Sequence, residues 1–164
     1  MVKPKAYPYP RHPSVRLWDL PGIRTMNCPS DTFLEQRHFR QYDMFIIISC
    51  GSFTNTDARL MEEIRTLGKT FYFVCSKVDF DVSSAQRING SEESALQTIR
   101  EDCLSCLGGE TDIFLISSWD PDKFDFPCLQ QTLAKQFRHR RAWALQEAPS
   151  KSSLPILQKI KVTL

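Results

Sequence analysis

Short runs of consecutive apolar residues alternate with amphipathic segments along this chain, and this alternation limits the possible folds more than any other feature. The runs cover 45–49, 71–75 and 113–116. Their length is typical of strands, and their unbroken apolar character indicates strands buried on both faces. Helical patterns lie between them, so we expect the α/β class, with a mostly parallel sheet and helices on both faces.

Other elements are predicted around these runs. A strand is expected at 15–18, where apolar and polar residues alternate. Helices are expected to begin near four polar or acidic positions, with a polar loop after the strand at 71–75 that extends to Gly90. The four starts are Ser30, Asn55, Ser91 and Asp125, and the helix near Asp125 carries Leu129, Leu133 and Phe137 on its apolar side.

The start of the chain is different in kind. Pro4, Pro8, Pro10 and Pro13 interrupt the first 13 residues. Proline disfavours regular structure, so 1–13 is predicted to be an extended arm without it. Because 164 residues suffice for one sizeable core, a single main domain is expected after the arm.

Composition and charge exclude several classes of protein. The net charge is +2, which calls for no nucleic-acid partner, although seven Lys or Arg and only one acid lie between Lys135 and Lys161. A solvated basic tail is the simpler interpretation. No signal peptide is apparent, no run is long enough to span a membrane, and six scattered cysteines fit a reducing compartment, so a cytoplasmic protein is expected.

Polar residues follow three of the expected strands, at the end where α/β sheets bind ligands. Asp19 and Gly22 follow the first strand in the pattern D-x-x-G. A carboxylate there can lie near a magnesium-bound water, and a glycine lets its backbone N–H approach a terminal phosphate. The pattern is short, and a simple turn after a strand also explains it.

A second pattern, S-K-V-D at 76–79, is more specific. The carboxylate of Asp79 can accept hydrogen bonds from N1 and N2 of guanine, and adenine offers no such donor pair. Lys77 would lie over the base plane, and Ser117-Ser118 would offer a backbone N–H to the guanine carbonyl. Together these residues predict a magnesium–guanine-nucleotide site. The alternative for 76–79 is a surface turn with a Lys–Asp pair.

Sequence blocks around these residues resemble the immunity-related (interferon-inducible) GTPases. The resemblance runs from about Tyr7 to Leu157 and implies a partial Ras-like P-loop NTPase domain that binds GTP or GDP with Mg²⁺. It also implies defence against intracellular pathogens, with intracellular membranes and other immunity-related GTPases as partners. The blocks are WDLPG at 18–22, NCPSDTFL at 27–34, YDMFIIIS at 42–49, FYFVCSKVD at 71–79, IFLISS at 113–118 and FDFP at 124–127.

The resemblance also implies a role for each site residue. Guanine nucleotide would be held by Asp19, Gly22, Ser76, Lys77, Asp79, Ser117 and Ser118, with Asp19 reaching Mg²⁺ through water, and no residue receives a catalytic role. Ser76 replaces the usual Asn or Thr, which keeps a hydroxyl but loses bulk. After the arm, 14–145 would be the C-terminal portion of the GTP-binding domain. The remaining 146–164 would be a linker and the start of a helical region.

Two parts of the family pattern are not found in these 164 residues, namely the phosphate loop G-x4-G-K-S and the switch I threonine. Gly68-Lys69-Thr70 is no substitute, because Glu63 stands where the first glycine is needed and the triplet leads into a strand. In a Ras-like fold the missing strand lies between those ending at Asp19 and Ser49. Two strand edges should therefore lack a partner, unless they pair directly or another chain fills the gap.

Two functions from different classes remain open. One is a GTPase of the resembled family, peripheral on intracellular membranes. The other is a catalytically inactive, truncated paralogue that acts as an interaction or regulatory module. Cys103-x-x-Cys106 supports neither a metal nor a redox site by its spacing, because no second pair accompanies it and it falls at a helix end.

Overall fold

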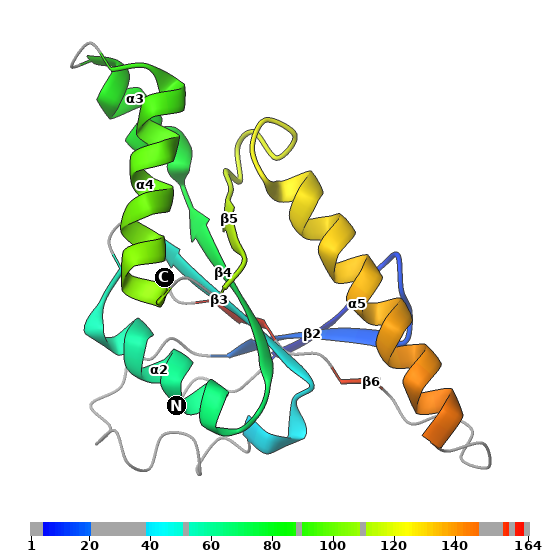
Figure 1. Ribbon diagram of the computed structural model, residues 1–164. Coiled ribbons are helices and arrows are strands. Elements are labelled where there is room, and N and C mark those ends of the chain that lie inside the picture. Colours follow the sequence, from blue (N-terminus) through cyan, green and yellow to red (C-terminus); the bar gives the residue numbers. More distant parts are fainter. Residues whose placement is uncertain are drawn as a thin grey trace.

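A computed structural model gives the fold of this chain (Figure 1). It describes residues 5–20, 39–50, 53–87, 90–108, 111–147, 156–157 and 160–162. The helix expected near Ser30 and the site residue Gly22 lie outside these ranges. The rest of the predicted elements can be compared with the structure directly.

The strands form one sheet in the order β1-β2-β7-β3-β4-β5, with β6 also paired to β2. Only β1 is antiparallel, and every other pairing is parallel. The predicted mostly parallel sheet is confirmed. The strands are β1 (Lys5–Pro8), β2 (Val15–Leu20), β3 (Met44–Cys50), β4 (Thr70–Ser76), β5 (Ile113–Leu115), β6 (Ile156–Leu157) and β7 (Ile160–Val162).

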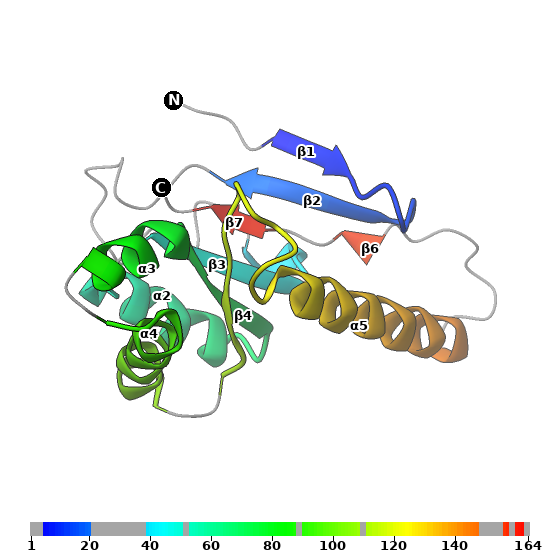
Figure 2. The ribbon, with the colours of Figure 1, turned by 90° about the horizontal axis from the view of Figure 1, so that it is seen from above.

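The helices flank both faces of this sheet, as the α/β class requires (Figures 1 and 2). One apolar core lies against α2 and α4 and includes Phe45, Phe73 and Leu107. The other lies against α5, whose predicted apolar residues Leu129, Leu133 and Phe137 are all buried. The helices are the short η3 (Phe39–Gln41), α2 (Asn55–Thr66), α3 (Val78–Arg87), α4 (Glu92–Leu107) and α5 (Phe126–Glu147).

Local sequence explains where α2 and α4 begin and end. Thr54 caps α2 in a capping box with Asp57, and Ser91 caps α4. Gly68 and Gly108 follow the two helices with φ of 65° and 73°, a backbone region that glycine adopts without strain. Gly68-Lys69-Thr70 is therefore a helix end leading into β4, as the sequence predicts.

The expectation of an N-terminal arm without regular structure is wrong for residues 5–8. These residues form β1 and pair antiparallel with β2, from Lys5↔Asp19 to Pro8↔Arg16. Prolines flank or end this strand, and an edge strand tolerates a missing N–H on its open side. The segment is extended, as expected, but it belongs to the sheet.

A second expectation is also corrected, that of an open gap between β2 and β3. The chain fills it with its own C-terminal segment: β7 pairs with β2 through Asp19↔Ile160 and with β3 through Ile47↔Lys161. β6 pairs with the start of β2 through Val15↔Ile156. Parallel pairing on both sides satisfies backbone groups that an empty gap would leave unpaired, each at about 1–3 kcal/mol.

The polar loop expected up to Gly90 contains a helix that the sequence pattern did not predict. This helix, α3, buries only Val78 and Val82, one turn apart. Ser83 and Ser84 donate hydrogen bonds to the carbonyls of Asp79 and Phe80 four residues back. Two apolar residues among serines and acids make too weak a periodic signal to detect.

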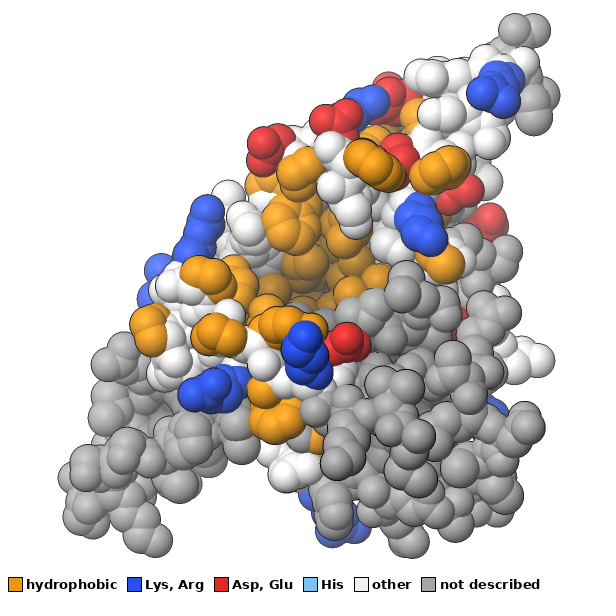
Figure 3. Space-filling view, turned by 180° about the vertical axis from the view of Figure 1, so that it is seen from behind, with side chains coloured by type: hydrophobic (Ala, Val, Ile, Leu, Met, Phe, Trp, Pro, Cys, Tyr) orange, Lys and Arg blue, Asp and Glu red, His pale blue; other side chains and the backbone are white. Residues whose placement is uncertain are grey.

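The face opposite that of Figure 1 has a hollow at its centre where hydrophobic side chains gather, with acidic and basic side chains along its upper rim (Figure 3). Apolar surface thus stays accessible on the described part of this face. None of the described helices combines the length and apolar character needed to cross a membrane.

Candidate functional site

The candidate site lies at the carboxyl ends of β4 and β5. These strands are parallel neighbours, so the segments that follow them meet at one edge of the sheet. Backbone hydrogen bonds join the two segments. The N–H of Ile116 donates to the carbonyl of Cys75 over 2.8 Å, and the N–H of Val78 donates to the carbonyl of Ile116 over 3.3 Å. The two predicted base-binding segments are therefore held together.

Lys77 lies at the turn between β4 and α3. Its φ is 63°, which makes it the only described residue other than glycine with a positive φ. Residues other than glycine rarely adopt this backbone conformation, and those that do tend to occur at functional sites. The carbonyl of Lys77 accepts a hydrogen bond from the N–H of Phe80 over 3.1 Å, which closes the turn. The Lys77 side chain is exposed and free to cover a ligand at this edge.

Ser76 uses its hydroxyl within the fold. Its Oγ donates to the carbonyl of Ser49 over 3.1 Å and so connects the ends of β4 and β3. Ser76, which is smaller than the usual Asn or Thr, thus keeps one hydrogen bond to the fold. It acts here by positioning the turn.

Asp79 is the central residue of the candidate site. It lies in the first turn of α3 and not in a loop, so the positive end of the helix dipole favours its negative charge. Its Oδ1 is buried and has no hydrogen-bond partner within the described part of the chain. A buried acceptor without a partner is unfavourable by about 1–3 kcal/mol. This oxygen is therefore ready to accept a hydrogen bond from a ligand.

A second carboxylate lies two residues further along α3. Burial, and to a smaller extent the charge of Asp79, raise the pKa of Asp81 above its ordinary value. The two acids therefore repel one another, which adds to the tendency of this helix end to accept a hydrogen-bond donor.

Ser117 and Ser118 differ in their surroundings. Ser117 is buried, and its Oγ accepts hydrogen bonds from the N–H of Trp119 over 3.1 Å and of Asp120 over 3.3 Å. The hydroxyl of Ser117 therefore shapes the turn, whereas Ser118 is exposed. Sequence reasoning missed two exposed aromatic residues beside the site, Trp119 at 84% and Phe80 at 62% exposure.

A hydrogen-bonded pair that was not predicted as part of the site braces β5. Asp125 accepts from Arg100 over 2.6 Å and from the N–H of Leu115 over 2.9 Å. Arg100 also donates to the carbonyl of Ile113 over 3.0 Å. This network joins α4, β5 and the start of α5. The only sequence signal for it was the acid that opens α5.

Asp19 lies apart from these residues. It is the penultimate residue of β2, exposed, and paired in register with Lys5 and Ile160. Neighbouring strands are about 4.8 Å apart, and β7 and β3 separate β2 from β4, so β2, which carries Asp19, and β4, which precedes Asp79, are on the order of 14 Å apart. In the described ranges no three His, Cys, Asp or Glu side chains form a group that could hold a metal ion. Asp19 lies at the end of β2, but the next residue, Leu20, is level with the middle of β4, through Lys161, Ile47 and Phe73. Asp19 therefore does not by itself make a magnesium site.

This mostly parallel sheet, flanked by helices and carrying the Ser76–Asp79 turn after β4, is a partial Ras-like domain of the P-loop NTPase class. Comparison with known proteins then identifies the family. The sequence profile of the family Interferon-inducible GTPase (IIGP) matches residues 1–159. The chain belongs to this interferon-inducible GTPase family.

Individual relatives agree with the profile. The chain is 40% identical to Interferon-inducible GTPase 5 of Bos taurus over an alignment that covers 98% of the chain and 36% of the bovine protein. It is 37% identical to Interferon-gamma-inducible GTPase 10 of Mus musculus, over 89% of the chain and 37% of that protein. T-cell-specific guanine nucleotide triphosphate-binding protein 2 of Mus musculus is also 37% identical, over 85% of the chain and 36% of its own length. The chain thus spans little more than a third of the length of these curated relatives.

Proposed function

We propose that this chain is the guanine-recognition portion of a GTP-binding protein of the interferon-inducible GTPase family, with Asp79 as the residue that selects guanine. The observation that supports this most is the buried Asp79 Oδ1 without a hydrogen-bond partner in the described residues. A guanine whose N1–H and N2–H groups face this carboxylate would remove the unfavourable energy of an unmade hydrogen bond.

The neighbouring residues take supporting roles in the proposal. The strained turn at Lys77 directs its stem across the base, and Ser76 and Ser117 hold the two turns through their hydroxyls. Ser118 supplies a backbone N–H for the guanine carbonyl. Asp19, with Gly22 after it, would face the phosphates and reach Mg²⁺ through water. When bound, Mg²⁺ would neutralise charge on the phosphate groups.

A variant that should change the base preference from guanine to xanthine tests this proposal. In Asp79→Asn the side-chain amide donates a hydrogen bond, which suits the C2 carbonyl of xanthine and not the C2 amine of guanine. We expect guanosine binding to weaken at least about tenfold, the factor that loss of one such hydrogen bond produces, while xanthosine binding appears. Binding is measured by ligand-observed NMR, with adenosine as a non-binding base and exposed Asp122→Asn as the matched control. Unchanged guanosine binding in Asp79→Asn would exclude Asp79 as the selecting residue.

The triphosphate should add little to the affinity of this chain alone. Most electrostatic stabilisation in phosphate-loop enzymes comes from the loop's backbone N–H groups, its lysine and the Ser/Thr on magnesium. The 164 residues contain no such loop. We therefore expect GTP to bind no more tightly than guanosine and no measurable release of phosphate. GTP turnover that Asp19→Ala abolishes would contradict this prediction.

One observation favours a second candidate, an inactive interaction module that pairs with other family members. β7 occupies the position between β2 and β3. A chain that completes its own sheet can fold and interact without nucleotide. Co-sedimentation with an intact family member, independent of GTP and unaffected by Asp79→Asn, would support this candidate over the first.

The wider cellular setting belongs to the same proposal. A cytoplasmic protein, peripheral on intracellular membranes, that contributes to cell-autonomous defence would agree with the family. Fractionation of cells that express the protein, with and without interferon, is the corresponding measurement. Recovery only in the soluble fraction under both conditions would remove the membrane from the proposal.

A further inference from the structure

Two cysteine thiols from distant parts of the sequence are in contact inside the domain. The Sγ atoms of Cys75, near the end of β4, and Cys103, on α4, are 3.1 Å apart. Both residues are buried, at 2% and 4% exposure, and neither is in a disulfide. This pair differs from Cys103-x-x-Cys106, whose spacing in the sequence supported neither a metal nor a redox site. The fold pairs Cys103 with a residue on another element.

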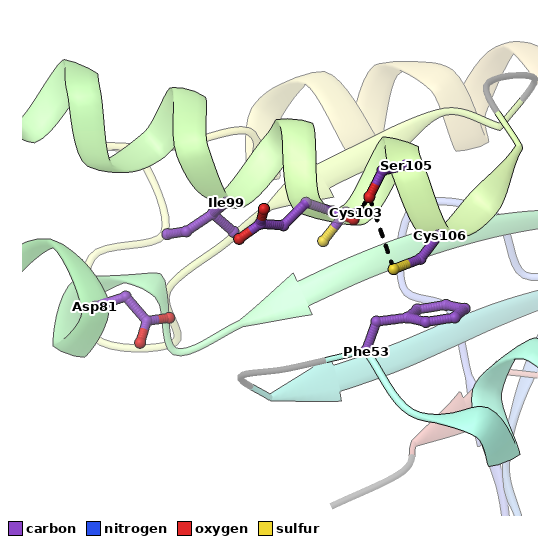
Figure 4. A pocket seen from close by; sticks show the side chains of 7 residues that line it. Phe53, Asp81, Ile99, Cys103, Ser105 and Cys106 are labelled. Atoms are coloured by element: carbon purple, nitrogen blue, oxygen red, sulfur yellow. Dashed lines mark hydrogen bonds between the residues drawn. The ribbon is translucent and has the colours of Figure 1, made fainter.

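One sulfur of the pair borders a cavity. Cys103 and Cys106 on α4 line an open pocket of about 350 Å³, and Phe53 and Asp81 line its other side (Figure 4). A peroxide is not much larger than a water molecule, whose share of liquid volume is about 30 Å³, so it fits easily. Cys75 is not among the lining residues. A small oxidant therefore meets Cys103 first, with Cys75 behind it.

The surroundings shift the pKa values of the two thiols in opposite directions. The hydrogen bond with Cys75 lowers the pKa of the Cys103 thiol, and Arg100 acts in the same direction, against burial and the charge of Asp102. The same hydrogen bond and burial raise the pKa of the Cys75 thiol. Cys103 is thus the more acidic of the two thiols, and the thiolate is the form that reacts with peroxides.

We propose that Cys75 and Cys103 form a peroxide-sensitive thiol pair that closes to a disulfide in the folded protein. In the first step the Cys103 thiolate attacks hydrogen peroxide, the O–O bond breaks, and Cys103 sulfenic acid and hydroxide form. In the second step the sulfur of Cys75 attacks that of Cys103, the S–O bond breaks, and the proton of Cys75 leaves with the departing oxygen as water. The hydroxide of the first step takes up the proton that the Cys103 thiol released, so in total two thiols and one peroxide give one disulfide and two waters.

The disulfide would join α4 to the residue directly before the Ser76–Asp79 turn. It would link two positions 28 apart in the sequence, and cross-links of this kind restrict the unfolded chain. The thiol chemistry does not depend on the proposed nucleotide site. A restricted turn after β4 would give oxidation an influence on guanine binding, and that consequence alone rests on the proposed function.

Peptide mapping without reduction tests the proposal on the full chain. The reduced protein is treated with equimolar hydrogen peroxide, free thiols are alkylated after denaturation, and the digest is analysed by mass spectrometry. We expect a Cys75–Cys103 linked peptide, lighter by two hydrogens than its two parts and released by dithiothreitol. Recovery of both residues as alkylated thiols, while exposed Cys106 or Cys128 is oxidised, would overturn the proposal.

Two serine variants give matched controls. Cys106→Ser removes the exposed thiol of the same cavity, and the yield of linked peptide should stay within about twofold of the unsubstituted chain. Cys103→Ser should remove the linked peptide completely and leave Cys75 reduced. If Cys103→Ser does not fold, the unsubstituted chain and Cys106→Ser together still show whether the Cys75–Cys103 disulfide forms. A link that forms between Cys106 and another residue in place of Cys75–Cys103 would contradict the assignment.

Discussion

The sheet has two halves, called its two sides below, and they differ in how their strands are arranged along the chain. On one side, β3, β4 and β5 pair in parallel, follow one another in the chain and are covered by α2, α4 and α5. On the other side, β2 is held between an N-terminal strand and two short C-terminal strands from the opposite end of the sequence. The candidate base site lies on the first side, where local sequence determines the packing. The second side depends on contacts between distant segments.

The largest difference should appear when each core is weakened. Phe73 is fully buried in β4 and packs against Phe53 with ring centroids 5.5 Å apart. Phe73→Ala should reduce the free energy of unfolding by about 3–5 kcal/mol. The matched change Leu17→Ala on half-buried β2 should cost less than about 2 kcal/mol. Urea titrations of both variants measure these values. Equal losses would mean that the two sides contribute equally to the core.

A change in β7 should separate the two sides more sharply. Lys161 pairs in register with Leu20 of β2 and Ile47 of β3. Lys161→Pro removes a backbone N–H from a central strand, where proline is disfavoured. Each backbone group left without a partner should reduce the free energy of unfolding by about 1–3 kcal/mol. Amide exchange should become faster in β1 and β2 and change little in β4 and β5. Lys161→Ala, which keeps the backbone pairing, is the control, and equal acceleration in all strands would refute the division.

The sequence predicted the first side well and the second poorly, for physical reasons. Consecutive apolar residues at 45–49 and 71–75 identify buried strands locally, and the stripe of Leu129, Leu133 and Phe137 identifies α5. The pairing of β7 with β2 and β3 joins residues far apart in the chain, and no local pattern records it. The helix α3 was missed because it buries only two valines.

The candidate site shows the same limit. The motif at 76–79 could be found because its residue types match the donors of guanine. The lack of a partner for Asp79 Oδ1, the bond from Ser76 to Ser49 and the contact between Cys75 and Cys103 depend on tertiary packing. Whether Asp19 and Gly22 act with Asp79 stays a prediction, as does the division of the chain at 13 and 145.

A smaller effect concerns pH. Partial burial raises the pKa of Asp81, so the folded state binds this proton more tightly than the unfolded state. The stabilisation from this proton is therefore complete below the ordinary pKa of 3.8 and is lost as pH rises through the raised value. Asp81→Asn should equal the unsubstituted chain at low pH and be more stable at neutral pH. Because Asp81 is largely exposed, the gain should be about 0.5 kcal/mol or less.

Thermal unfolding at several pH values measures this difference between the two proteins. The exposed Asp122→Asn is the control for the loss of one surface carboxylate. An Asp81→Asn variant that is less stable at neutral pH would show that the carboxylate makes a favourable contact in the folded state.

Backbone NMR of the isotopically labelled chain during titration with guanosine tests the central claim most directly. The claim is that the ends of β4 and β5 alone form a guanine-recognition site. It predicts amide shift changes confined to Ser76–Phe80 and Ser117–Asp120, absent with adenosine and lost in Asp79→Asn. Shift changes that cluster instead around β2 and β7, or that adenosine reproduces equally, would contradict it.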